Sequence, residues 1–451
     1  MNLDKYNKPV PRYTSYPPAN HFTGEFTGAD YTALIDSSNN REPEHIAIYI
    51  HIPFCRHICF YCGCNSCSLG DGGVVKDYIG AVKSEIKNVI ALLDNRRKVS
   101  QIHFGGGTPN AIDSGYLQEI ISLIAGNFNF IENPEIAIEC NPAYLDQSYL
   151  QALKDAEFNR YSLGIQDFSQ QVLKVVNRKP SVLPVNELIG FIRKDPAASV
   201  NLDFIYGLPL QTVDSFGETI EQAVSLRPDR LVTFSYAHVP WVKKSQLILE
   251  KKGLPGPEEK MAMFKKASGL LTEAGYIPVG LDHYVLPEDE LNVAQQNNML
   301  HRNFQGYCSR RTTGQVYAFG VSAISQLEGG YAQNTKDIDK YIARIGNSEF
   351  AVEKGYRLSG REKIVREIIT RLMCNYRLDW EELSTELKES TEILKHLTDY
   401  GQLESFARDD MLEYDEKKII IKDKGKFFIR IIASSFDPAY KTGENKYSRP
   451  V

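Results

Sequence analysis

From residue 46 onward, short runs of apolar and β-branched residues alternate with longer amphipathic stretches. Short apolar runs predict buried strands, and amphipathic stretches, such as 75–93 and 212–226, predict helices. Six strands are predicted in this way, over residues 46–52, 100–104, 136–139, 160–163, 200–205 and 230–234. Because helical crossovers join parallel strands, the pattern indicates an α/β fold with a parallel sheet. It leaves open a closed or partly closed barrel and a flat doubly wound sheet.

The polar and glycine-rich motifs lie where the predicted strands end. A cysteine cluster follows the first strand, and the later strands end at or just before Gly105 to Gly107, Glu139, Gln166, Asp203 and residues 236–238. Catalytic residues of β/α barrels gather at the carboxyl ends of the strands. This placement favours the barrel and predicts an active site on that face.

The segments on either side of the predicted barrel, which spans residues 46–350, have different patterns. Residues 1–45 form an N-terminal arm that is proline-rich and irregular over 9–18. Residues 351–451 predict a mainly helical domain, with a helix over 358–372 and strands over 417–421 and 427–432, an order typical of a winged-helix-like module. This segment has 19 Lys plus Arg and 19 Asp plus Glu, so it lacks the basic surface of a DNA-binding domain. We expect it to pack beside the barrel mouth.

Composition narrows the class of protein. The chain has 451 residues, of which 42% are hydrophobic, enough for a full core. No apolar run approaches the roughly 18 residues of a membrane span, and the first residues lack the apolar segment of a signal peptide. The net charge of −5 offers no general attraction for nucleic acid. We therefore expect a cytoplasmic monomer without nucleic-acid or membrane partners.

Five of the eight cysteines fall within thirteen residues, at Cys55, Cys59, Cys62, Cys64 and Cys67. The first three have the spacing C-x3-C-x2-C, which offers three thiolates to a four-iron cluster and leaves one iron without a protein ligand. Structural zinc needs four ligands, usually in two pairs, and no second pair is visible in the sequence. A disulfide framework belongs to short secreted chains. The spacing favours an iron–sulfur site, with zinc as the alternative.

The cysteine motif, followed by Gly63-Cys64-Asn65, resembles the radical S-adenosylmethionine (SAM) superfamily, and within it the oxygen-independent coproporphyrinogen III oxidases (coproporphyrinogen dehydrogenases). Further similar segments lie along nearly the whole chain, at residues 11–16, 49–54, 105–109, 164–168, 201–209, 236–238, 301–307 and 320–324. The resemblance implies an open six-unit β/α barrel.

The resemblance also implies a cofactor set and its ligands. A 4Fe–4S cluster would be held by Cys55, Cys59 and Cys62. Two SAM molecules would lie beside it, the first contacting Tyr49, Gly106, Glu139 and Ile324, and the second contacting Tyr61, Gly107, Thr108, Gln166, Arg178, Asp203 and Ala237. The resemblance further marks Tyr49, Cys64, Glu139 and Ile324 as catalytic. Glycines allow close approach of a ligand to the backbone, and an arginine suits a carboxylate.

The implied reaction converts two propionates of coproporphyrinogen III into vinyl groups by a 5'-deoxyadenosyl radical, giving protoporphyrinogen IX. It needs an electron donor and an electron acceptor, neither of which the sequence identifies. Since the substrate carries four carboxylates, we expect cationic anchors among Arg12, His301, Arg302, Arg310 and Arg311. The chain departs from the family's usual sequence at Tyr61, at Cys140 and over residues 307–320.

Three other functions remain open. A haem chaperone of the same superfamily would share the barrel and three cysteines but typically lacks Cys64 and the long N-terminal arm. A haem-opening methyltransferase and a zinc-dependent interaction protein are the more distant alternatives. Cys64 and the arm, both present here, favour the oxidase.

Overall fold

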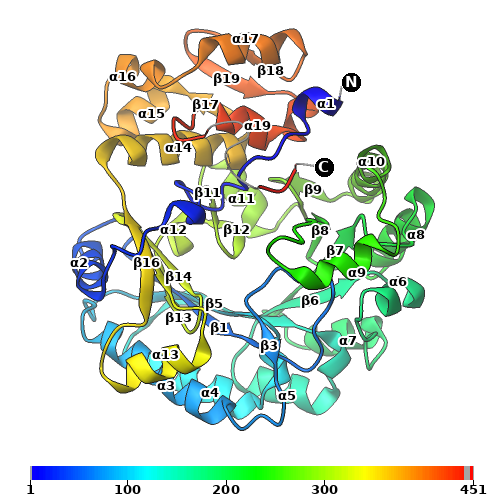
Figure 1. Cartoon of the computed structure of the whole chain (residues 1–451), viewed down its shortest axis with the longest axis vertical. Helices are drawn as coiled ribbons and strands as arrows, with labels where there is room; N and C mark the ends of the chain where they lie inside the picture. The colour runs from blue at the N-terminus through cyan, green and yellow to red at the C-terminus, as the bar shows by residue number, and fades with distance from the viewer. Residues whose placement is uncertain (1–2, 441–446, 450–451) are drawn as a thin grey trace.

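The computed structural model describes residues 3–440 and 447–449 (Figure 1). Its centre is a mixed sheet of twelve strands. Six of these are parallel and adjacent in chain order: β1 (Ile46–Ile52), β4 (Val99–Gly106), β5 (Phe130–Cys140), β6 (Arg160–Gln166), β7 (Ser199–Tyr206) and β8 (Arg230–Ser235). All six predicted strands are confirmed. In the described residues the sheet ends at β16 and β9, so the predicted open barrel is also confirmed.

Helices follow the parallel strands and cover the outside of the barrel (Figure 1). They are α3 (Val75–Ile90), α4 (Ser114–Ala125), α5 (Gln147–Asp155), α6 (Gln170–Val175), α7 (Val185–Ile192), α8 (Val213–Ser225) and α10 (Pro257–Glu273). The predicted helices over 75–93 and 212–226 correspond to α3 and α8. Thr212 begins α8 with a capping box, in which its side chain accepts from the Ser215 N–H and the Ser215 side chain accepts in return.

Shorter strands extend the parallel sheet at both edges. Beyond β1 lie β13 (Val316–Phe319), which is parallel to β1, and the antiparallel β14 (Ile324–Leu327), β15 (Gly330–Asn334) and β16 (Val352–Arg357). Beyond β8 lie β10 (His283–Val285) and β9 (Ile277–Val279). β16 joins this sheet although it follows residue 350, so the division at 350/351 stays a prediction. The hairpin of β11 (Leu300–Asn303) and β12 (Gly306–Ser309) lies beside the barrel mouth.

A second hydrophobic core begins with α14 (Gly360–Asn375). It continues through the antiparallel sheet β17 (Arg377–Asp379), β19 (Lys418–Ile421) and β18 (Leu412–Tyr414), and the helices α15 (Trp380–Leu387), α16 (Thr391–His396) and α17 (Tyr400–Arg408). The mainly helical domain and its small sheet are therefore confirmed.

The strand predicted over 427–432 is wrong. This segment follows α18 (Asp423–Lys426) and contains most of α19 (Ile429–Ser434), and every residue of α19 is buried. A short apolar run that is buried on all sides has no periodicity to separate helix from strand. Packing of α19 against α14 decides the outcome.

The N-terminal arm connects the two cores. It contains α1 (Leu3–Tyr6), the 3-10 turn η1 (Ala19–His21) and α2 (Gly28–Ser38). Between η1 and α1 the arm is irregular, as predicted, and Val10 and Tyr13 pack into the second core. Arg430 of α19 donates to the carbonyls of Val10 and Pro11, whereas α2 packs against the barrel core. This path places Arg12 at the boundary between the cores.

No helix in the described ranges is long and apolar enough to cross a membrane.

Candidate active site

Two adjoining cavities lie at the carboxyl ends of the parallel strands. We call the first, of about 530 Å³, the cysteine cavity; among its lining residues are Cys55, Cys59, Tyr61, Cys62, Cys64, Gly106, Gly107, Thr108, Glu139, Gln166, Arg178 and Asp203. The second, of about 450 Å³, is lined in part by Tyr49, Cys64, Gly106, Glu139 and Ile324. The structure thus brings together all the predicted site residues except Ala237, which follows β8 and lines neither cavity.

The cysteines lie on a loop that follows β1. The short strands β2 (Phe54–Cys55) and β3 (Cys67–Ser68) pair and close this loop. Cys55 and Cys59 are buried, and all three cysteines of the predicted cluster are free thiols. Cys55 Sγ lies 3.3 Å from Thr108 Oγ1, and Arg178 Nη1 lies 3.6 Å from Cys59 Sγ. The guanidinium of Arg178 thus lies beside one of the three predicted cluster ligands.

These thiols suit an iron–sulfur cluster. Three of them line one cavity, and a cubane cluster takes each thiolate on a different iron. Among the described residues, no three His, Cys, Asp or Glu side chains are arranged to hold a single metal ion. A structural zinc site would need four ligands around one ion. The donor set therefore fits the cluster that the spacing predicts.

The glycines at the end of β4 allow close packing against β1. A Cβ on Gly107 would lie 2.6 Å from the carbonyl carbon of Pro53, and one on Gly106 would lie 2.6 Å from the His51 ring. Gly106 also has a φ of +114°, which favours glycine. The Gly107 N–H donates to the Ile52 carbonyl at 2.8 Å. The bare backbone therefore comes to lie between the cysteine loop and Glu139.

Glu139 is held as a carboxylate beside this backbone. Burial raises its pKa, but a 3.1 Å hydrogen bond with His103 and a 3.2 Å bond from the Gly106 N–H outweigh burial, so the net pKa is lower than usual. Tyr49 stacks on His103, with ring centroids 5.9 Å apart, and its hydroxyl lies 3.2 Å from His51 Nδ1. A negative carboxylate in this position suits an ammonium group or a ribose diol.

Sequence reasoning missed His51 and His103. A signal was present in the sequence. Gln101, His103 and Gly105 are every second residue of β4, and such residues of a strand share a face. The strand pattern thus placed His103 on the face that bears the glycine motif. The pairing of His103 with Glu139 depended on the adjacent strand.

Asp203 and Gln166 lie on the opposite wall of the cysteine cavity, on β7 and β6. Ser162 donates to Asp203 at 2.7 Å and Asn201 at 2.8 Å, and burial raises the pKa of Asp203 to about 6. The Gln166 side-chain oxygen is buried and has no hydrogen-bond partner among the described residues. Arg178 donates to the Gly164 carbonyl. This wall offers acceptors and one cation to a polar ligand.

The five candidate anchors differ in position. Arg12 and Arg302 line the cysteine cavity. Arg310 is instead paired with Glu367 and Glu386, and His301 is buried, with Nε2 3.2 Å from the Gln326 amide nitrogen. The side chain of Arg311 lies outside the described residues. Two of the five are therefore placed to meet a ligand.

Comparisons with known proteins find relatives that match nearly the whole chain. Residues 49–223 match the family model described as the Radical SAM superfamily. The chain is 37% identical to the oxygen-independent coproporphyrinogen III oxidase of Synechocystis sp., covering 100% of this chain and 97% of that protein. It is 36% identical to the enzyme of the same name from Escherichia coli, covering 96% and 94%. The solved structure of E. coli coproporphyrinogen III oxidase, described as a radical SAM enzyme, superimposes with a TM-score of 0.88 and 35% identity, covering 95% of this chain and 98% of that chain.

Proposed function

Because the chain belongs to the family of oxygen-independent coproporphyrinogen III oxidases, we propose that it converts two propionates of coproporphyrinogen III into vinyl groups. The product is protoporphyrinogen IX, an intermediate of haem biosynthesis. Each conversion removes one hydrogen atom from a propionate β-carbon, releases carbon dioxide and passes one electron to an acceptor. The observation that carries the proposal is the cysteine cavity, in which three thiols, a glycine-rich strand end and Glu139 face one another.

The cofactors supply the difficult step. When bound, a 4Fe–4S cluster and SAM provide reductive formation of a carbon radical that takes the hydrogen atom. Cys55, Cys59 and Cys62 would hold the cluster. The backbone of Gly106 and the carboxylate of Glu139 would bind and orient SAM, because His103 keeps that carboxylate charged.

We propose that two SAM molecules bind, one in each cavity. Volumes of about 450 and 530 Å³ lie within the roughly 300–1,000 Å³ range of small-ligand sites. The first molecule would contact Tyr49, Gly106, Glu139 and Ile324. The second would contact Tyr61, Gly107, Thr108, Gln166, Arg178 and Asp203, and the unpaired Gln166 oxygen and the Asp203 carboxylate support this assignment. Cys64 and Gly106 lie between the two. A contact with Ala237 stays a prediction.

The remaining parts of the proposal concern the cellular setting. We propose a cytoplasmic monomer that receives electrons from a separate donor and passes them to a separate acceptor. The arm (residues 1–45), barrel (46–350) and C-terminal domain (351–451) would act as one unit, since the arm packs into both cores.

An anaerobic assay tests the function directly. Protein with a reconstituted cluster is mixed with a reductant, SAM, coproporphyrinogen III and an electron acceptor, and products are read by mass spectrometry. We expect the substrate to lose the equivalent of two formic acids, with formation of 5'-deoxyadenosine, and the Glu139→Gln variant to form little of either product. Stoichiometric haem binding by protein with a full cluster, without any vinyl product, would instead indicate a haem carrier.

A further inference from the structure

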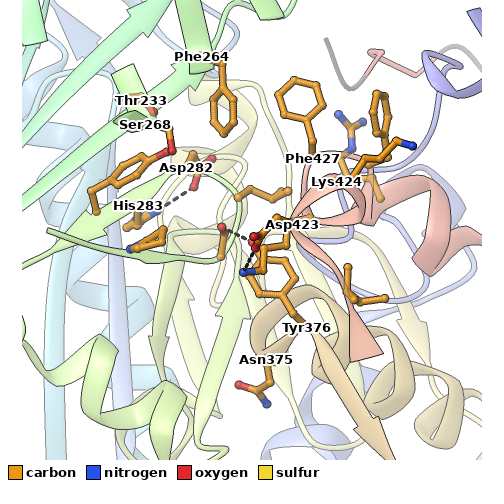
Figure 2. A pocket seen from close by; sticks show the side chains of 18 of the residues that line it. Thr233, Phe264, Ser268, Asp282, His283, Asn375, Tyr376, Asp423, Lys424 and Phe427 are labelled. Atoms are coloured by element: carbon orange, nitrogen blue, oxygen red, sulfur yellow. Dashed lines mark hydrogen bonds and ion pairs between the residues drawn. The ribbon is translucent and has the colours of Figure 1, made fainter. Parts of the chain in front are cut away.

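A third and larger cavity, of about 1150 Å³, lies between the barrel and the C-terminal domain (Figure 2). We call it the inter-domain cavity. Phe264 of α10 and Tyr284 of β10 line it on the barrel side, and Tyr376 and Phe427 line it on the C-terminal side. Phe264 and Phe427 meet edge to face across the domain boundary, with ring centroids 4.9 Å apart. Aromatic rings therefore line the cavity from both sides of the domain boundary.

The inter-domain cavity adjoins the cysteine cavity. Both are lined by Arg12, Phe234, Asp282, His283 and Arg302. These residues come from the N-terminal arm, from β8, from the start of β10 and from β11. We call this shared boundary the junction, and a ligand in the inter-domain cavity lies next to the cysteine cavity there.

The charge of the inter-domain cavity is opposite to that of the whole protein. Eight Lys and Arg residues line it, against three Asp and no Glu, although the chain has a net charge of −5. Two of the cations, Arg12 and Arg302, form no ion pair in the described part of the chain and share one nearby carboxylate, Asp282, which itself pairs with His283. Arg12 makes no hydrogen bond or ion pair with any described residue, and the Nε of Arg302 is buried without a hydrogen-bond partner. Arg302 is only 9% exposed, and within the described residues its side chain donates one hydrogen bond, to the Tyr307 hydroxyl at 3.4 Å.

The unpaired cations are also close enough to repel one another. Burial and Arg302 together lower the pKa of Arg12, and burial, Arg12 and Arg302 lower that of Arg430. Burial and Arg12 lower the pKa of Lys260 to about 8. Arg430 donates to backbone carbonyls and the Ser448 hydroxyl. Because these acceptors are neutral, they leave the positive charge of Arg430 uncompensated. Like charges brought together away from water are costly without anions, so this arrangement suits a ligand with several negative charges.

We propose that the inter-domain cavity holds the body of the tetrapyrrole, and that Arg12 and Arg302 bind its carboxylates at the junction with the cysteine cavity. This inference rests on the proposed function, which supplies a ligand with four carboxylates. The aromatic walls pack against the macrocycle, and Lys418 and Lys424 of the C-terminal domain face the carboxylates that point away from the junction. The N-terminal arm and the C-terminal domain are thereby parts of the substrate site.

The volume agrees with this assignment. Small-ligand sites measure roughly 300–1,000 Å³, and the inter-domain cavity exceeds this range while each of the two predicted SAM cavities falls within it. A propionate that reaches the junction from the inter-domain cavity meets Arg12, Arg302 and Asp282 there.

The test measures binding of coproporphyrin III, the fluorescent oxidised form, which keeps the four carboxylates. Binding is followed by fluorescence anisotropy under anaerobic conditions, with the cluster and SAM present. We expect Arg12→Leu and Arg302→Leu each to weaken binding about 10- to 100-fold, as for loss of a charge-assisted contact. Arg302→Lys should recover part of the affinity. Arg96→Leu, a change at an exposed arginine paired with Asp94, is the matched control and should bind as the wild type does.

A second porphyrin separates carboxylate recognition from packing. Deuteroporphyrin IX carries two carboxylates, and we expect its weaker binding to depend less on Arg12. Iron content and circular dichroism show whether each variant is folded. If a change at the buried Arg302 prevents folding, Arg12→Leu still tests the proposal, because Arg12 lies in the irregular arm.

Binding and turnover together distinguish the proposed substrate site from the proposed reaction. The substrate site alone would be overturned if the wild type turns over substrate but the arginines do not affect binding. In that case the folded Arg12→Leu variant and every folded Arg302 variant would bind coproporphyrin III as tightly as the wild type does. Binding that depends on both arginines, without any vinyl product from the wild type, would support the tetrapyrrole site and overturn the proposed reaction.

Discussion

The imidazole of His103 on β4 and the carboxylate of Glu139 on β5 meet across two adjacent parallel strands, with Nε2 3.1 Å from Oε1. Gly105 makes room for this contact, since a Cβ there would lie 2.7 Å from Glu139 Oε1. The pair fixes both the position and the charge of the carboxylate that is proposed to bind the first SAM.

Removal of His103 should make SAM binding more sensitive to acid. His103 holds the pKa of Glu139 below its usual value, so the carboxylate stays charged as the pH falls. In His103→Leu the effect of burial on Glu139 is less compensated, so the pKa of Glu139 rises. The acid limb of the SAM affinity profile therefore moves to higher pH. Calorimetric titration of SAM between pH 5.5 and 8 measures the shift, with His103→Gln, which keeps a donor, as the control. Superimposable acid limbs would contradict the assigned role of His103.

The cysteines should fall into two classes. Cys55→Ala, Cys59→Ala and Cys62→Ala are expected to lose the cluster absorbance, because each removes one of the three thiolates. Cys64→Ala should retain iron but lose turnover, because Cys64 follows Cys62 by one glycine, is exposed and lines both SAM cavities. Iron analysis and visible absorbance of anaerobically purified variants give the result. Equal iron loss in all four, or zinc in place of iron, would show that the assignment is wrong.

Replacement of Arg178 should impair the reaction without loss of iron. Its guanidinium lies 3.6 Å from Cys59 Sγ and donates to the Gly164 carbonyl. In Arg178→Leu, loss of this cation should lower the reduction potential of the cluster and reduce turnover by about 10-fold or more. Redox titration followed by electron paramagnetic resonance measures the potential. Lys174→Leu, at an exposed position of α6, is the control, and a potential equal to that of the wild type would rule out an effect of Arg178 on the cluster.

The ionised carboxylate of Asp203 should destabilise the folded protein at neutral pH. Its pKa in the folded protein is about 6, above the ordinary aspartate value of 3.8, because burial disfavours the charge. The folded state therefore binds a proton more tightly than the unfolded state, and stability falls as the pH rises from about 4 to 6. Asp203→Asn should be more stable than the wild type by up to about 3 kcal/mol at pH 7, with the difference vanishing near pH 4.

Urea unfolding of both proteins at several pH values tests this difference. The same variant should lose turnover, because the proposed contact with the second SAM needs the carboxylate. A stability difference that does not change with pH would refute the burial of a charged Asp203.

Glu85 should stabilise the turn that precedes Ile324, the first residue of β14. This buried carboxylate accepts from the Gly320 N–H at 2.9 Å, from Asn334 at 2.7 Å and from Tyr341 at 2.6 Å. Glu85→Leu leaves these donors without an acceptor, each at a cost of about 1–3 kcal/mol. We expect a marked fall in the free energy of unfolding and, where the variant folds, weaker SAM binding. Glu85→Gln keeps an acceptor and should retain most of the stability, and equal losses in the two variants would contradict this explanation.

The sequence by itself determined the parts of this protein that depend on local pattern. Apolar runs separated by amphipathic stretches located all six parallel strands, because a strand buried on both faces is apolar along its whole length. The spacing of Cys55, Cys59 and Cys62 within one loop already defined three ligands for a cluster. The glycines after β4 and the carboxylates at strand ends located the active-site face, since parallel strands place their carboxyl ends together.

Tertiary structure alone decided the parts that depend on contacts between distant segments. The segment 427–432 became helical because it packs against α14, and its apolar run had no periodicity to show this. Among the expected anchors, Arg310 pairs with Glu367, whereas Arg12 and Arg302, 290 positions apart in the chain, come together near a single shared carboxylate, Asp282. Periodicity reports which face of an element is buried, but not which charge from another element will meet it. The cation cluster of the inter-domain cavity was therefore visible only once the arm, the barrel and the C-terminal domain had packed together.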